Sequence, residues 1–100
     1  LEFRRVLFRS EAIVHRGRSL LPIGLLDVEG DFGVGAVVDV RDGNDREVAR
    51  GLTDYPSDAL RRIRGKRTSE IADVLGRKDY DAVIHRDNMV VLDTADGEQT

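Results

Sequence analysis

The feature that most constrains the fold is a pair of short apolar segments on either side of a turn sequence. Residues 36–41 read AVVDVR and residues 47–52 read EVARGL, with DGND at positions 42–45 between them. Runs rich in β-branched residues that flank an Asp-Gly turn predict a β-hairpin. A sheet therefore organises at least the middle of the chain, and the remaining segments have to pack around it.

Two short helices are expected after the hairpin. Ser57 can cap a first helix that runs to Gly65, and Thr68 or Ser69 can cap a second helix that ends at Gly76. Apolar residues in both segments recur at intervals of three or four, so each helix has one face to bury. We expect the following residues to share one core: Leu60, Ile63, Ile71, Val74 and Leu75 from the helices, with Val37, Val40 and Val48 from the hairpin.

Several other segments have extended character. Residues 20–29 (LLPIGLLDVE), 82–84 (AVI) and 89–92 (MVVL) are expected to be extended or in short strands, and residues 11–17 (EAIVHRG) fit either the end of a helix or a strand. Residues 93–100 are polar and form a tail. Together with the hairpin, these segments predict a mainly β fold with two short helices.

The first ten residues, LEFRRVLFRS, do not resemble the rest of the chain. They can be encoded by CTG GAG TTC AGA CGT GTG CTC TTC CGA TCT, which resembles the end of a widely used sequencing adapter. We interpret residues 1–10 as translated adapter, so that native sequence begins near Glu11 and the chain is a fragment of a longer protein. The alternative is a genuine strand, because Arg5-Val6-Leu7-Phe8 has some β character.

Composition excludes several classes of site. The chain has 100 residues, which is enough for one domain, and no cysteine, which excludes disulfides, thiolate metal sites and a thiol nucleophile. No apolar run approaches the length that a membrane-spanning helix needs. The formal net charge is −3, so general nucleic-acid binding is disfavoured, although a local basic patch could still serve.

The sharpest local feature is ALRRIRGKR at residues 59–67, which holds five cations without one acid. Such a cluster could contact phosphates, or it could complement the helix dipole and pair with nearby acids such as Asp58 and Glu70. The chain has only two tyrosines and no tryptophan, which argues against an RNA reader that stacks several bases. The candidate residues for contact with RNA or a partner are Arg61, Arg64, Lys66 and Arg67.

No catalytic, cofactor-binding or metal-binding residue is assigned from the sequence. A phosphate-binding loop is rejected because Leu60 and Arg67 stand where that pattern needs glycine and serine or threonine. The glycines of residues 30–35 fit a tight turn better than a dinucleotide fingerprint. His15 and His85 have no spacing that indicates a metal site, and we interpret them as structural.

Seven short segments form an ordered set across nearly all of residues 11–92. They are SLLPIG (19–24), VEGDF (28–32), ARGL (49–52), YPSDALRRIRG (55–65), SEI (69–71), VLG (74–76) and HRDNMV (85–90). The set resembles the C-terminal domain of bacterial glutamate 5-kinases, a PUA domain named after pseudouridine synthases and archaeosine transglycosylases. Two positions depart from the family: Ala36 replaces a usual acid, and Arg77 replaces a common tyrosine.

The resemblance implies a PUA-like pseudo-barrel that is incomplete at its N-terminal strand. Family members have a first strand and most of a helix before the position of Glu11, and the RVLF sequence of residues 5–8 could stand in for that strand. The implied division is an adapter translation at 1–10, a PUA domain at 11–92 and a polar tail at 93–100.

The resemblance also implies a role. The chain would be an accessory, non-catalytic domain of a cytoplasmic enzyme that phosphorylates L-glutamate with ATP, the first step of proline biosynthesis. ATP and Mg²⁺ would bind to a missing N-terminal amino-acid kinase domain, and the parent would be a homo-oligomer. The alternatives are a stand-alone PUA module that binds RNA and, least favoured, an independent enzyme.

Overall fold

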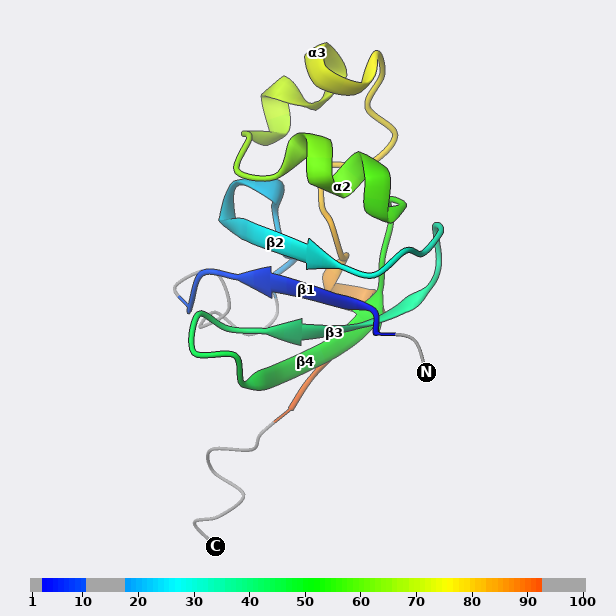
Figure 1. The fold of residues 1–100 in the computed structure, drawn as a ribbon. Helices are drawn as coiled ribbons and strands as arrows, with labels where there is room; N and C mark the ends of the chain where they lie inside the picture. Colours follow the sequence, from blue (N-terminus) through cyan, green and yellow to red (C-terminus); the bar gives the residue numbers. More distant parts are fainter. Residues whose placement is uncertain (1–2, 11–17, 93–100) are drawn as a thin grey trace, which may run out of the picture.

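The computed structural model describes residues 3–10 and 18–92. The fold is mainly β with two short α-helices, as expected, and Figure 1 shows its arrangement. In chain order the elements are β1 (Arg5–Phe8), η1 (Pro22–Gly24), β2 (Leu25–Glu29), β3 (Val37–Arg41), β4 (Glu47–Leu52), α2 (Ser57–Ile63), η2 (Thr68–Glu70), α3 (Ile71–Leu75), η3 (Arg86–Asn88) and β5 (Met89–Val91). The expectations for residues 11–17 and 93–100 lie outside the described residues.

The five strands form one sheet in the order β2-β1-β3-β4-β5. Neighbouring strands are antiparallel except β1 and β3, which are parallel. Strands β3 and β4 form the predicted hairpin, but Asp45, not Gly43, takes the positive φ of 63° in its turn. The Asp45 amide donates to the Asp42 carbonyl at 2.9 Å, and the register shifts by one position after Val40.

Strand β1 lies inside the sheet, between β2 and β3. Its alternate residues Val6 and Phe8 are fully buried. Gly30 has a φ of +93°, and a Cβ atom there would collide with the backbone oxygen of Phe3. The RVLF sequence thus lies between β2 and β3, and the sheet has no gap there.

The core lies between the inner face of the sheet and the helices. Helix α2 lies beside β2, and α3 packs on α2 on the side away from the sheet, as Figure 1 shows. Leu60, Ile63 and Ile71 are fully buried, as the helical spacing predicted, while Val74 and Leu75 are partly buried against them. The inner face of the sheet contributes Val6, Phe8, Leu25, Val28, Val38, Val40 and Ala49.

The sequence assignment of Val37 to the core is wrong. Val37 is 49% exposed, whereas Val38 and Val40 are fully buried. Side chains alternate between the two faces of a strand, so Val37 and Val40 cannot point the same way in a regular strand. Val40 was predicted correctly, and Val48 is partly buried against the core.

The helix starts also differ from expectation. Pro56 is the N-cap of α2, and the Ser57 hydroxyl instead accepts the Phe32 amide at 3.1 Å, which holds the loop before β3 against the helix. The second helical segment begins with a 3₁₀ turn in which the Glu70 carboxylate accepts the Arg67 amide at 2.7 Å. Gly65 and Gly76 adopt positive φ after each helix, as predicted.

Candidate functional site

The basic segment predicted as a contact surface begins on α2. Arg61 lies 3.4 Å from Asp31 and 3.3 Å from Asp58, and its guanidinium also donates to the Gly30 carbonyl at 2.6 Å. Arg64 lies 3.3 Å from Asp27 of β2. These contacts fasten α2 to the end of β2, so the two arginines have acidic partners within the domain.

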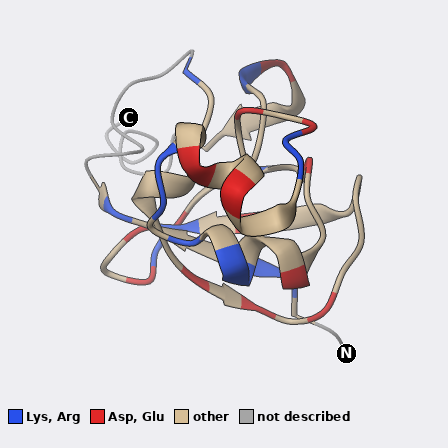
Figure 2. Cartoon of the chain, turned by 90° about the horizontal axis from the view of Figure 1, so that it is seen from above, with Lys and Arg blue, Asp and Glu red and all other residues tan. Residues whose placement is uncertain are grey.

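The other cations of the segment behave differently. Arg62 donates to the Val74 carbonyl and so links α2 to α3. Among residues 3–10 and 18–92, neither the Lys66 ammonium nor the Arg67 guanidinium donates to a side chain or carbonyl. Figure 2 shows acidic and basic positions side by side over the helices, not a continuous basic face. Of the four candidate residues, Arg61 and Arg64 thus have carboxylate partners in the domain, whereas the side chains of Lys66 and Arg67 have none among the described residues.

The outer face of the sheet, opposite the helices, carries a cross-strand row of charges. Glu29 lies beside Arg5 at 3.5 Å, and the Arg5 backbone pairs with Asp39 on the next strand. Arg50 lies 3.3 Å from Asp39 and 2.8 Å from Glu47. The hydrogen bond from Arg50 lowers the pKa of the Glu47 carboxyl below its ordinary value, against the opposing effect of burial. Each arginine of the row therefore lies beside at least one carboxylate of the same row.

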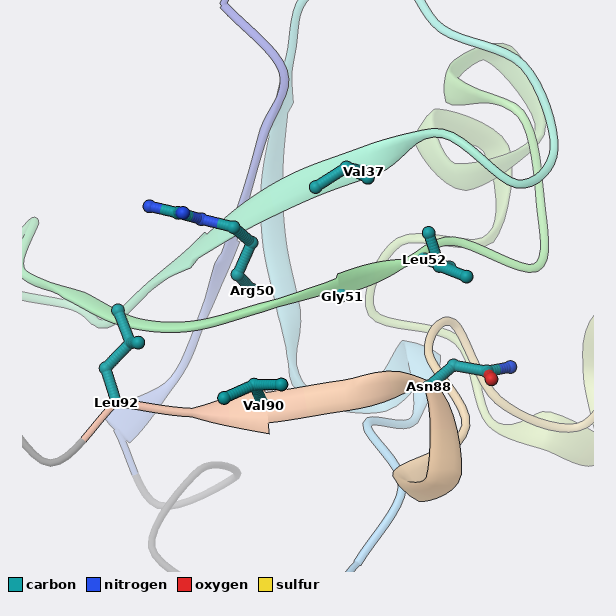
Figure 3. Close-up of a pocket in the computed structure, with 7 residues that line it drawn as sticks. All are labelled: Val37, Arg50, Gly51, Leu52, Asn88, Val90 and Leu92. Carbon is teal, nitrogen blue, oxygen red and sulfur yellow. The ribbon is translucent and has the colours of Figure 1, made fainter.

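Next to this row lies an apolar depression, which we call the outer groove. Figure 3 shows its lining, which comes from three strands and the turn before β5. Val37, Leu52 and Val90 are 49%, 40% and 66% exposed, and the groove has a volume of about 360 Å³. The complete lining is Val37, Arg50, Gly51, Leu52, Asn88, Val90 and Leu92.

Strand β5 approaches β4 closely at Gly51, which is one of the lining residues of the groove. Gly51 pairs with Met89, and a Cβ atom on Gly51 would lie 2.7 Å from the Asn88 carbonyl oxygen and 3.2 Å from the Met89 Cα. Only glycine therefore fits there without displacing β5. Sequence reasoning missed the groove because it placed Val37 in the core. The alternation of side chains along a strand puts Val37 on the opposite face from Val38 and Val40.

No described part of the chain carries an evident catalytic arrangement. His85 Nδ1 accepts the Asp87 amide at 3.0 Å and caps η3, which fits the structural interpretation of this histidine. His15 lies outside the described residues. No cluster of three or more potential metal ligands occurs within residues 3–10 and 18–92. Over the same ranges, no helix has the length and apolar character needed to cross a bilayer.

Comparisons with a family model, with curated proteins and with solved structures all find PUA domains or glutamate 5-kinases. Residues 9–75 match the PUA domain family. The chain is 49% identical to glutamate 5-kinase of Moorella thermoacetica and 52% identical to that of Carboxydothermus hydrogenoformans, over 83% and 84% of its length. It spans only 22% and 23% of those relatives. A crystal structure of a PUA domain from Aeropyrum pernix covers 82% of the chain with a TM-score of 0.59 and 24% identity, which supports the fold.

Proposed function

This chain belongs to the PUA domain family, and from that premise we propose that it is the accessory, non-catalytic PUA domain of a glutamate 5-kinase. The observation that carries the proposal is identity near 50% over more than four fifths of the chain with proteins of that name. The parent would use ATP to phosphorylate L-glutamate in the first step of proline biosynthesis, in the cytoplasm.

The chemistry of phosphoryl transfer belongs to the part of the relatives that this chain does not span. Such transfer needs amides that cradle phosphates, a cationic clamp and a metal site. Arg61 and Arg64 are engaged with Asp31, Asp58 and Asp27 inside the domain, so they do not form such a clamp. ATP and Mg²⁺ would bind to the amino-acid kinase portion of the parent, which would also assemble as a homo-oligomer.

The DNA upstream of the codon for Glu11 tests this proposal. We expect an open reading frame in register with Glu11 that encodes an amino-acid kinase domain, and a junction with adapter sequence at residues 1–10. Purified chain should not turn over ATP with glutamate, whereas the recovered parent should. A promoter and start codon directly before Glu11, or robust turnover by the 100-residue chain, would contradict the proposal.

RNA binding is the second candidate, and Lys66 and Arg67 are the observation in its favour. The side chains of these two residues lie beyond the end of α2 and donate to no described group, so they could contact phosphates together with Arg61 and Arg64. The internal pairing of the two arginines limits the number of phosphate contacts, and we expect weak, strongly salt-dependent binding at most. Titration of a structured RNA at several salt concentrations, with the K66E/R67E double variant as comparison, tests this. Tight binding that the double variant retains would exclude these residues as the site.

A further inference from the structure

We propose that the outer groove is the surface on which this domain docks against the kinase portion of its own parent polypeptide. The inference rests on the proposed function and specifies which face of the domain meets its neighbour.

The shape and composition of the outer groove support a docking role. Single exposed aliphatic residues are ordinary on protein surfaces, but here Val37, Leu52 and Val90 come from three strands and line one concavity. Met89 pairs with Gly51 in the sheet, which sets the register of β5 against β4 beneath these side chains. The groove is thus a preformed apolar surface on a rigid sheet.

Charge favours a protein partner over a polyanion at this face. Arg50 is the one cation in the lining, and its guanidinium is held by Asp39 and Glu47. Figure 3 shows the Arg50 side chain extending away from Leu52 and Asn88. Arg50 thus lines the groove with its charge already paired to two carboxylates. An occupant with apolar side chains fits this surface, whereas a phosphate backbone would find no available cation.

We infer the occupant of the groove, the kinase portion, from the length of the relatives. This chain spans 22% of the Moorella thermoacetica enzyme, so more than three quarters of such a polypeptide is available to cover the groove. Domains joined in one chain meet at high effective concentration, so a modest apolar contact is enough to hold them together. A second copy of this domain is the competing occupant, and the experiment below separates the two.

Hydroxyl-radical footprinting of the 100-residue chain and of the recovered full-length parent tests the inference. In the parent we expect the oxidation rates of Leu52 and Val90 to fall at least about threefold, as side chains do at the core of an interface. Leu26 is the matched control, because it is 45% exposed on β2 at the opposite edge of the sheet and its rate should not change. The Leu52→Asp parent should lose the protection at Val90, whereas the Leu26→Asp parent should retain it.

The outcomes distinguish failure of the inference from failure of the proposed function. A recovered gene without a kinase domain removes the proposed function and the inference with it. A kinase-containing parent in which Leu52 and Val90 stay as reactive as in the short chain overturns the inference alone. Protection that appears in the short chain as its concentration rises, together with dimers in sedimentation, identifies a second copy as the occupant and likewise overturns it.

Discussion

The phenol of Tyr55 holds the backbone of Tyr80 through both of its hydrogen-bonding functions. The Tyr55 hydroxyl donates to the Tyr80 carbonyl and accepts the Tyr80 amide at 2.9 Å. The two rings meet edge to face with centroids 6.1 Å apart. Because Tyr55 is 4% exposed and lies before α2, this contact fastens the segment after α3 to the core.

We expect Tyr55→Phe to lower the free energy of unfolding by about 1–3 kcal/mol, because it leaves two backbone groups of Tyr80 without their partner. Urea denaturation followed by circular dichroism measures the change. Tyr80→Phe is the control: the Tyr80 hydroxyl makes no hydrogen bond to the described residues, so its loss should cost less than about 0.5 kcal/mol. Equal effects of the two variants would show that ring packing, not hydrogen bonding, provides the stabilisation.

The buried carboxylate of Asp42 should make stability depend on pH. It accepts the amides of Arg46 at 3.0 Å and Asn44 at 2.9 Å. The Arg46 backbone hydrogen bond, with help from the Asn44 amide and the Arg46 charge, lowers the pKa of Asp42 despite the opposing effect of burial. A folded-state pKa below the unfolded one stabilises the fold fully above the unfolded value, about 3.9, and the stabilisation disappears as pH falls through the folded value.

Asp42→Asn should therefore cost about 1–2 kcal/mol at pH 7 and progressively less below about pH 4. Urea denaturation across this range measures both quantities. Asp45→Asn in the same turn is the control, because the Asp45 side chain is 71% exposed and asparagine tolerates the positive φ at that position. A cost for Asp42→Asn that stays constant down to pH 2 would contradict the linkage.

A buried position on α2 and an exposed position on β3 can be compared directly. Ile63→Ala should cost about 2–5 kcal/mol, because Ile63 is fully buried between α2 and the sheet. Val37→Ala should cost less than about 1 kcal/mol, since Val37 lies half exposed on the outer face. Thermal and urea unfolding measure both variants. A larger loss from Val37→Ala than from Ile63→Ala would contradict the assignment of Val37 to the outer face of the sheet.

Strand β1 should be necessary for the 100-residue chain to fold, whatever its origin. Phe8 is fully buried between β2 and the parallel strand β3, so Phe8→Ala should cost about 3–5 kcal/mol. Leu7→Ala, on the opposite face of the same strand and only partly buried, should cost clearly less. If the Phe8→Ala chain had the same free energy of unfolding as the unmodified chain, β1 would not insert into the sheet in solution.

Local signals in the sequence determined the elements of this domain. The turn before Glu47, the glycines at 65 and 76 and the three-to-four spacing of Leu60 and Ile63 act over a few residues, so the hairpin and both helices could be predicted. The absence of cysteine likewise excluded several classes of site from the chain alone, and the ordered family segments indicated the PUA fold.

Only the tertiary structure decided which residues far apart in the sequence contact one another. Val37 and Val38 are both β-branched neighbours, and strand register alone turns one outward to the outer groove and the other into the core. Arg61 meets Asp31 thirty positions away, and Tyr55 meets Tyr80 twenty-five positions away. Such pairs depend on strand order and on the packing of whole elements, because long-range contacts form only when a shared core is buried and no local pattern records them.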